Sequence, residues 1–232
     1  MIETSSAVIA AAGSSRRMQG QDKLRMPLAG RLTLARTIDV FEASPLIDRI
    51  VLVLNEERLA DVEELCRREG WRKIAGILAG GLRRQDSVRR GLDALANISP
   101  QCKWVMIHDG ARPLVTPAML EAGLQAAVLH QAAIAAVPVK DTIKHVAGGF
   151  VTATLDRSQH VAIQTPQVFS FPLIHSAHNS PEAWEDVTDD AALLERLGQS
   201  VAIFPGSYSN IKITTLEDVY IAEALIKGAG GL

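Results

Sequence analysis

The residues of this chain best suited to chemistry follow a short apolar run near its start. The segment Ser6 to Met18 begins apolar, stops at Gly13 and continues with hydroxyls and arginines. Backbone N–H groups and hydroxyls at Gly13, Ser14 and Ser15 can donate hydrogen bonds to phosphate oxygens. Three basic side chains follow this glycine: Arg16, Arg17 and Lys23. We interpret the stretch as a candidate polyphosphate site, and a solvated basic turn is the alternative that local chemistry leaves open.

Small residues lead into this charged loop. Ala10, Ala11, Ala12 and Gly13 would allow a flat base or a phosphate to approach the backbone closely. Neither glycine-rich nucleotide fingerprint is present, because Gly13 has no partner glycines and no Gly-Lys-Ser/Thr ending follows it. Such a short apolar run suits a strand buried on both faces of a sheet. The C-terminal ends of such strands are where open α/β sheets bind ligands.

A carboxylate directly follows another apolar run. Residues 103–108 are expected to form a buried strand, and Asp109 comes next, before a Gly-Ala-Arg-Pro turn. Because the carboxyl ends of parallel strands meet at one edge of a sheet, we expect Asp109 to lie near the Gly13 loop. A carboxylate beside a polyphosphate is repulsive unless a divalent cation bridges them, which implies magnesium. The alternative is that Asp109 only caps the next turn and pairs with Arg112.

The composition is that of an ordinary globular chain and excludes several classes of protein. The 232 residues are 47% hydrophobic, which is ample for a sizeable core. With 24 basic and 26 acidic residues the net charge is −2, so no overall field favours nucleic acid or an anionic membrane. No apolar segment approaches the roughly 20 residues of a membrane span, and the first four residues lack the pattern of a signal peptide. We therefore expect a cytoplasmic protein that binds neither nucleic acid nor membrane.

Cysteine and histidine spacing argues against a transition-metal site. Cys66 and Cys102 have no C-x-x-C partner, so free reduced thiols are expected. His175 and His178 are neighbours on a predicted helix, but no cysteine or carboxylate joins them at ligand spacing. Magnesium at Asp109 is thus the one metal that the sequence suggests.

Strands alternate with helices over most of the first 139 residues. After the first strand, the apolar patterns predict strands at 49–54, 73–78, 103–108 and 132–139, and helices at 33–43, 56–69, 84–96 and 117–130. Further on, they predict helices at 172–178, 190–197 and 216–227 and a strand at 201–205. This alternation predicts an α/β fold with a mostly parallel, twisted sheet and helices on both faces.

The segment 140–168 breaks the alternation. It lacks a helix signal and contains short, partly polar strand patterns at 141–145, 151–155 and 161–163, around the turn at Gly148 and Gly149. It has too little apolar surface for a core of its own. We therefore expect a single domain over 1–232, from which 140–168 projects as a β-arm that packs on another subunit.

Six motifs together resemble one enzyme family. They are A-A-A-G-S-S-R-R-M at 10–18, H-D-G-A-R-P at 108–113, P-V-K-D-T-I-K at 138–144, T-P-Q at 165–167, V-T-D-D at 187–190 and N-I-K-I-T at 210–214. In this order they are similar to the 2-C-methyl-D-erythritol 4-phosphate cytidylyltransferases of non-mevalonate isoprenoid biosynthesis. That family has a Rossmann-like nucleotide-diphospho-sugar transferase fold.

The resemblance implies a reaction and a set of residues. The reaction is transfer of CMP from CTP to 2-C-methyl-D-erythritol 4-phosphate with release of pyrophosphate, supported by Mg²⁺, in a homodimer with shared active sites. The implied catalytic residues are Arg17, Lys23 and Lys212, and the metal ligand is Asp109. The implied CTP-binding positions are Ala11, Ala12, Gly13, Gly81 and Ser87. The implied acceptor-binding positions are Arg112, Thr142, Arg157, Thr165 and Thr188, with Arg157 reaching the neighbouring subunit.

Such a reaction needs no general base, because the acceptor phosphate is already a nucleophile at neutral pH. Catalysis then rests on positioning and on electrostatic stabilisation, which suits a site rich in Arg, Lys and Thr. Two alternatives stay open: a cytidylyltransferase for another polyol phosphate such as ribitol 5-phosphate, and a non-catalytic nucleotide-binding regulator. Asp189 and Asp190 could form an acid/base pair or a second metal site, but we expect them to place negative charge at the start of the following helix.

Overall fold

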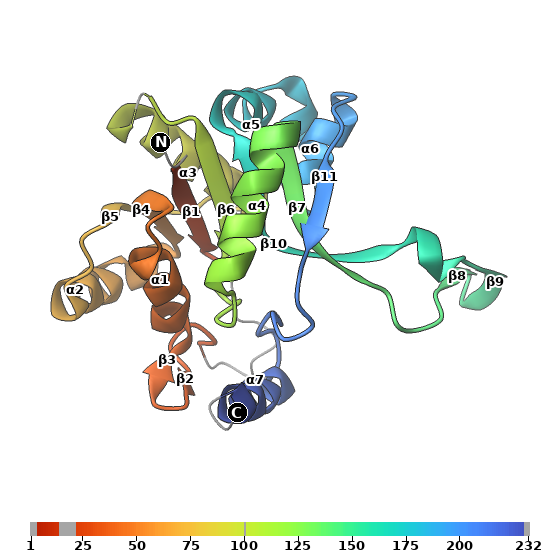
Figure 1. Cartoon of the computed structure of the whole chain (residues 1–232), viewed down its shortest axis with the longest axis horizontal. Helices are drawn as coiled ribbons and strands as arrows, with labels where there is room; N and C mark the ends of the chain where they lie inside the picture. Colours follow the sequence, from red (N-terminus) through yellow and green to blue (C-terminus); the bar gives the residue numbers. More distant parts are fainter. Residues whose placement is uncertain (1–3, 14–21, 100, 230–232) are drawn as a thin grey trace.

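The computed structural model describes residues 4–13, 22–99 and 101–229. Within these residues a seven-stranded sheet forms the centre, in the order β11-β7-β10-β6-β1-β4-β5 (Figure 1). Its strands are β1 (Ser5–Ala11), β4 (Ile47–Leu54), β5 (Ile74–Ala79), β6 (Trp104–Asp109), β7 (Ala132–Pro138), β10 (Val161–Ser170) and β11 (Ala202–Pro205). Only β10 runs antiparallel to its neighbours, β6 and β7. The prediction of a mostly parallel sheet is confirmed.

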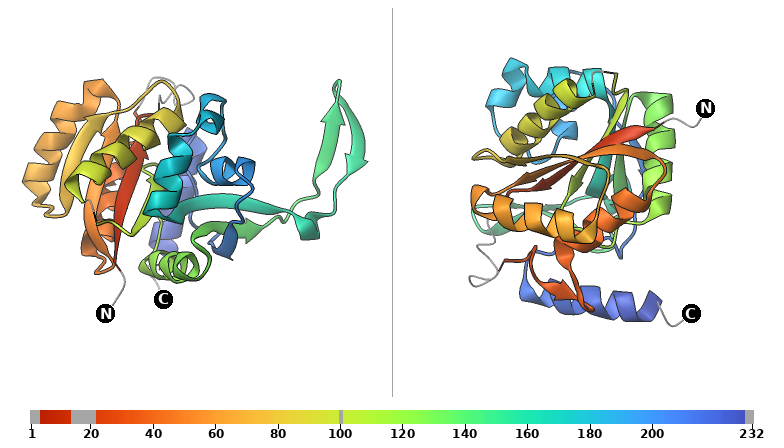
Figure 2. Two further views of the ribbon diagram at one scale, coloured as in Figure 1. Left: turned by 90° about the horizontal axis from the view of Figure 1, so that it is seen from above. Right: turned by 90° about the vertical axis from the view of Figure 1, so that its left-hand side faces the viewer.

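Helices cover both faces of the sheet, as the alternating pattern predicted (Figures 1 and 2). On one face lie α1 (Thr33–Ala43), α2 (Leu59–Glu69) and α4 (Pro117–His130), and on the other lie α3 (Arg84–Ile98), α5 (Phe171–His178) and α6 (Ala191–Arg196). Strand β1 shows how one strand serves both layers: Ala7 and Ile9 join the first core and Val8 joins the second. Because successive side chains of a strand alternate between faces, an apolar run with no polar break indicates burial on both sides.

The last helix belongs to a smaller cluster below the sheet edge. Helix α7 (Leu216–Ala229) packs against the short hairpin of β2 (Pro27–Leu28) and β3 (Arg31–Leu32) through Leu28, Ile213 and Val219. This packing anchors the segment before α7, and that segment carries Lys212. No helix in the described ranges is long and apolar enough to cross a membrane.

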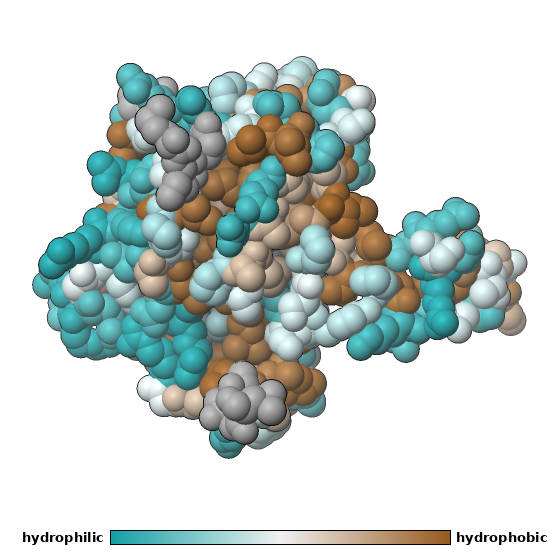
Figure 3. All heavy atoms as spheres, in the orientation of Figure 1, coloured by the Kyte–Doolittle hydropathy of each residue, from teal (hydrophilic) through white to brown (hydrophobic). Residues whose placement is uncertain are grey.

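Most of the segment 140–168 forms a projecting arm that ends in a hairpin (Figures 1 and 2). The hairpin strands are β8 (Lys144–Ala147) and β9 (Phe150–Thr154), and every residue in them is exposed. A short 3-10 turn, Arg157–Gln159, follows them. Apolar side chains lie bare on the hairpin, including Phe150, which is 78% exposed. Hydrophobic residues also gather at the base of the arm beside β11 (Figure 3), where Ile163 and Ile203 are exposed.

The structure extends the strand expected at 161–163. Strand β10 continues to Ser170 and lies in the middle of the central sheet, so the end of the segment 140–168 belongs to the body and not to the arm. Polar residues at 164–167 interrupt the apolar pattern, so the sequence does not predict that the strand continues through them. They can be buried because distant groups complete their hydrogen bonds. The Gln164 amide exchanges two hydrogen bonds with the backbone of Ser207, and Gln167 Nε2 donates to Asp189 Oδ2.

Candidate active site

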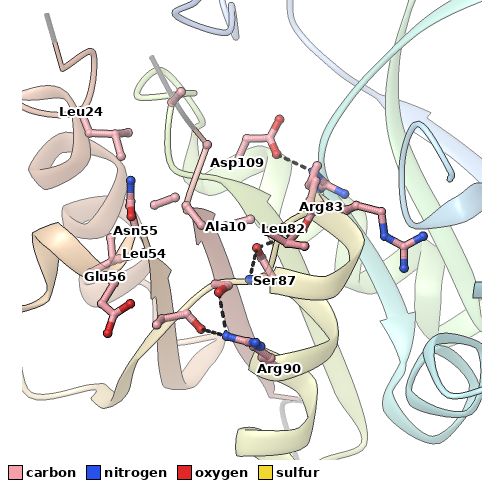
Figure 4. Close-up of a pocket in the computed structure, with 18 of the residues that line it drawn as sticks. Ala10, Leu24, Leu54, Asn55, Glu56, Leu82, Arg83, Ser87, Arg90 and Asp109 are labelled. Atoms are coloured by element: carbon pink, nitrogen blue, oxygen red, sulfur yellow. Dashed lines mark hydrogen bonds and ion pairs between the residues drawn. The ribbon is translucent and has the colours of Figure 1, made fainter. Parts of the chain in front are cut away.

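A pocket of about 700 Å³ opens at the carboxyl ends of the parallel strands (Figure 4). The last residues of β1, β4, β5 and β6 all line it, because parallel strands end at a common edge. The structure brings these residues from the sequence analysis together in its wall: Ala11, Ala12, Gly13, Lys23, Gly81, Ser87, Asp109 and Lys212. Arg17 lies outside the described residues.

Asp109 is the anionic centre of this pocket. Its side chain is buried, and Lys212 Nζ lies 2.7 Å from its Oδ2. Arg84 Nε lies 3.1 Å from Oδ1, and Arg112 Nε lies 3.9 Å from Oδ2. Burial opposes ionisation, yet the positive charges of Arg84, Lys212 and Arg112 hold the pKa of Asp109 well below its usual range. The carboxylate is therefore charged at neutral pH, and it sits among three cations.

Small residues at the ends of β1 and β5 line another part of the pocket. Gly81 N donates to Ser87 Oγ at 3.0 Å, and Ser87 Oγ donates to the carbonyl of Arg83. Arg90 Nη1 donates to the carbonyls of Ala79 and Gly80 and holds this turn in place (Figure 4). A methyl group on Gly80 would lie 2.4 Å from Ala12 Cβ. We call this part of the wall the small-residue slot, because its short side chains would allow a flat ring to approach the backbone closely.

Thr165 lies behind Asp109 rather than in the pocket lining. Its hydroxyl accepts a hydrogen bond from Asp109 N at 3.0 Å and lies 3.0 Å from His108 Nδ1. Burial lowers the pKa of His108 to about 4, so this ring is neutral at pH 7. The hydroxyl of Thr165 then donates to Nδ1, and Nε2–H donates to the carbonyl of Arg112. In this chain Thr165 fixes the backbone at Asp109, although the family resemblance implies a contact with the acceptor.

The remaining acceptor positions are spread over the molecule. Arg112 Nη1 donates to the carbonyl of Asn210, which ties the turn after β6 to the segment with Lys212. Thr188 is exposed in the loop before α6. Thr142 and Arg157 lie on the arm, are exposed and are absent from the pocket wall, and Arg157 Nη1 donates to the carbonyl of Lys140.

Arg84 is the site residue that the sequence patterns missed. It bridges two carboxylates, with Nε on Asp109 and Nη1 on Asp190 at 2.7 Å. Its position could have indicated its role: Arg84 is the first residue of a predicted helix, where the helix dipole disfavours a cation unless anions lie nearby. Asp189 lies near the start of α6 as expected, where its Oδ1 accepts from Ala192 N. Asp190 is the N-cap residue of α6, at the helix start as expected, but its side chain makes no capping hydrogen bond. Its buried carboxylate contacts Arg84 and His178.

The donor set of the pocket suits a hard cation bound mainly by a ligand. Among the described residues no group of three or more His, Cys, Asp and Glu side chains could hold a metal ion by itself. His175 and His178 contact separate aspartates, Asp93 and Asp190. Magnesium often takes one or two carboxylates and completes its shell with water and substrate phosphates. Asp109, which lines the pocket, fits that mode.

Fold and pocket together define a nucleotide-dependent transferase. The carboxyl edge of a mostly parallel sheet carries the small-residue slot and a cationic cluster around one carboxylate in the same pocket. The family model of 2-C-methyl-D-erythritol 4-phosphate cytidylyltransferase matches residues 5–228. The chain belongs to this family and is a cytidylyltransferase.

Individual relatives agree with this assignment. An enzyme of this name from Dehalococcoides mccartyi is 49% identical over 222 residues, which cover 95% of each chain. One from Syntrophotalea carbinolica is 46% identical over 230 residues, covering 96% of each chain. The crystal structure of 4-diphosphocytidyl-2C-methyl-D-erythritol synthase from Anaerococcus prevotii is similar with a TM-score of 0.85 and 33% identity, over 97% of this chain and 99% of that one. None of these supports a ribitol phosphate enzyme or a silent regulator.

Proposed function

We propose that this pocket transfers CMP from CTP to 2-C-methyl-D-erythritol 4-phosphate, forming 4-diphosphocytidyl-2-C-methyl-D-erythritol and pyrophosphate in the non-mevalonate isoprenoid pathway. The observation that carries the proposal is the cluster of Lys212, Arg84 and Arg112 around Asp109, in the same pocket as the slot at Gly81 and Ser87. The base occupies the slot, and the triphosphate extends towards the cations. Lys23 lines the same wall and adds positive charge.

Transfer follows from charge placement. An acceptor phosphate oxygen forms a bond to the α-phosphorus, the bond from that phosphorus to the bridging oxygen breaks, and pyrophosphate leaves with the electron pair. Lys212 and Lys23 stabilise the negative charge that grows on the phosphoryl oxygens, which is electrostatic catalysis by fixed cations. A magnesium ion held by Asp109 and the phosphates would offset further charge on the triphosphate.

A turnover assay tests the reaction and its specificity. Purified protein is given CTP with 2-C-methyl-D-erythritol 4-phosphate or another polyol phosphate, including ribitol 5-phosphate, and pyrophosphate release is followed. We expect turnover with the methylerythritol phosphate only, and none after chelation of divalent cations. Comparable turnover with ribitol 5-phosphate would assign another acceptor. Full activity in excess chelator would remove magnesium from the mechanism.

We further infer a homodimer in which the arm completes the partner's site. The hairpin β8–β9 exposes apolar side chains, among them Val146, Phe150 and Val151, on a segment with no core of its own. Such a surface is stabilised when a second subunit covers it. In a two-fold dimer the contact is reciprocal, so Arg157 of each arm would serve the acceptor phosphate in the other subunit. The cytoplasmic location, and the absence of nucleic-acid and membrane partners, stay predictions.

Complementation between two inactive variants tests the shared site. Lys23→Ala and Arg157→Ala proteins are mixed in equal amounts, unfolded together and reassembled, and mixed dimers are verified by mass. About half of the dimers are then mixed, and one site in each has both residues intact, so about a quarter of all sites recover activity. Each variant treated alone is the control. If Arg157 serves its own chain, every site carries a defect and mixing restores nothing.

A further inference from the structure

A buried row of charges leads from the pocket into the interior. Asp190 is fully buried, and its Oδ2 lies 2.7 Å from Arg84 Nη1. Arg84 Nε in turn lies 3.1 Å from Asp109 Oδ1. On the far side of Asp190, His178 Nε2 lies 3.1 Å from Oδ1. One guanidinium thus joins two carboxylates, of which only Asp109 lines the pocket.

This arrangement makes the orientation of Arg84 depend on Asp190. A guanidinium is a planar fork, so two contacts to separate carboxylates fix both its position and its plane. Arg84 is the first residue of α3, where the helix dipole disfavours a cation, and its side chain is partly buried. The positive charge of Arg84 is therefore stabilised by its two carboxylate partners, Asp109 and Asp190.

Asp190 also offsets part of the positive charge of the cluster around Asp109. Asp109 faces Arg84, Arg112 and Lys212, and Asp190 is the second carboxylate in contact with Arg84. Without the negative charge of Asp190, Arg84 would have a single carboxylate partner and would turn fully towards Asp109. Both the added hydrogen bonding and the more positive surroundings would make Asp109 a poorer ligand for a divalent cation.

We propose that Asp190 is a positioning residue for the transfer reaction. Through Arg84 it keeps Oδ1 of Asp109 in a fixed place and leaves Oδ2 directed at Lys212 and the incoming triphosphate with its cation. The inference rests on the proposed role of Asp109 as the magnesium ligand. It concerns a residue that lies outside the pocket wall and acts only through a second side chain.

Binding of Mn²⁺, read from the electron paramagnetic resonance signal of the free ion, tests this without turnover. The protein is saturated with α,β-methylene-CTP, which holds the cation but cannot transfer CMP. Asp190→Asn keeps the shape of the side chain and removes its charge. Loss of a direct partner of a metal ligand typically weakens metal binding on the order of 10- to 100-fold. Because Asp190 acts on Asp109 only through Arg84, we expect its loss to weaken Mn²⁺ binding by about 10-fold, the lower end of that range. In the turnover assay kcat should fall while the KM for the acceptor is kept.

Asp189→Asn is the matched control. It removes the same charge one residue away, from a carboxylate that contacts Gln167 and Ala192 and not Arg84. We expect its Mn²⁺ affinity to stay close to that of the wild type. Equal losses in both variants would overturn the proposal, because the effect would then be general electrostatics or a damaged α6.

Arg84→Lys provides an independent test if Asp190→Asn does not fold. It keeps the positive charge but cannot span two carboxylates, so it should weaken Mn²⁺ binding by a similar factor, and the double variant should be no weaker than either single one. Wild-type Mn²⁺ affinity in the folded variants would overturn the positioning role. Asp109→Asn separates the two proposals. If this variant keeps the wild-type Mn²⁺ affinity, the magnesium role of Asp109 is refuted. If Asp109→Asn loses Mn²⁺ affinity and Asp190→Asn does not, only the positioning role of Asp190 is refuted.

Discussion

Replacement of Lys212 by methionine tests whether this residue stabilises the transition state or merely pairs with Asp109. The substitution removes the ammonium group and keeps most of the apolar stem. The folded state loses the contact of 2.7 Å between Nζ and Asp109 Oδ2. Asp109 keeps Arg84 and Arg112 as partners, and the Lys212 side chain is 37% exposed, so solvent screens the lost pair. We expect the free energy of unfolding to change by about 1 kcal/mol or less.

The expected effect on turnover is much larger. Loss of one fixed donor that faces a developing negative charge typically lowers kcat by about 10²- to 10³-fold, or about 2.7–4 kcal/mol. Because the interaction strengthens as charge develops, kcat should fall far more than the affinity for CTP. Pyrophosphate release at saturating substrates gives kcat, and calorimetric titration with CTP gives the binding constant.

Lys227→Met, on an exposed part of α7, is the control for loss of a surface lysine. It should leave kcat and CTP binding unchanged. A kcat of Lys212→Met within about threefold of the wild type would refute the assignment of Lys212 to the transition state. A loss of CTP affinity that accounts for the whole loss of kcat/KM would equally refute it, since Lys212 would then bind substrate and transition state alike.

Further predictions concern the slot, the buried histidine and the base. Gly80→Ala places a methyl group 2.4 Å from Ala12 Cβ and 2.6 Å from Ser87 Oγ; it should lower the free energy of unfolding by about 1–3 kcal/mol in urea denaturation and weaken CTP binding. Gly13→Ala, with no atom within 4 Å of the new methyl group, should change stability by about 0.5 kcal/mol at most. The folded pKa of His108, about 4, lies below its ordinary value of 6.5, so the unfolded chain takes up this proton first as the pH falls. Stability should therefore decrease by about 3 kcal/mol between pH 6.5 and 4, and His108→Gln should flatten that part of the profile. A small-residue slot should also favour CTP strongly over ATP in competition binding, and equal affinities would contradict the slot as the base site.

Local patterns were enough for the elements that depend on their own periodicity. The helices expected at 33–43 and 117–130 have those bounds in the structure. The second of them is capped by Thr116, whose hydroxyl accepts from Met119 N, and Pro117 is its first residue. These two consecutive residues are a common signal for the start of a helix. The position of Asp109 at the carboxyl end of a buried strand was also predicted from local order alone, because it directly follows an apolar run.

Strand β10 could not be bounded from the sequence. Gln164, Thr165 and Gln167 interrupt its apolar pattern, and a hydrophobic period treats them as the end of a strand. They are buried because Ser207, His108 and Asp189, all distant in the chain, satisfy their hydrogen bonds. A polar group is stable in a core only when such partners exist, and only the folded chain shows whether they do.

The sequence alone thus determined the sheet class, the sheet edge at which the pocket lies, the family and the carboxylate in that pocket, because each of these is carried by consecutive residues or by motifs in order. The tertiary structure decided how that carboxylate is held. Arg84 contacts Asp109 and Asp190 from 25 and 106 residues away in the chain. A sequence shows an arginine at a helix start and two aspartates elsewhere, and only the packing of α3, α6 and β6 brings the three charges into one buried row, where each is stabilised by the next.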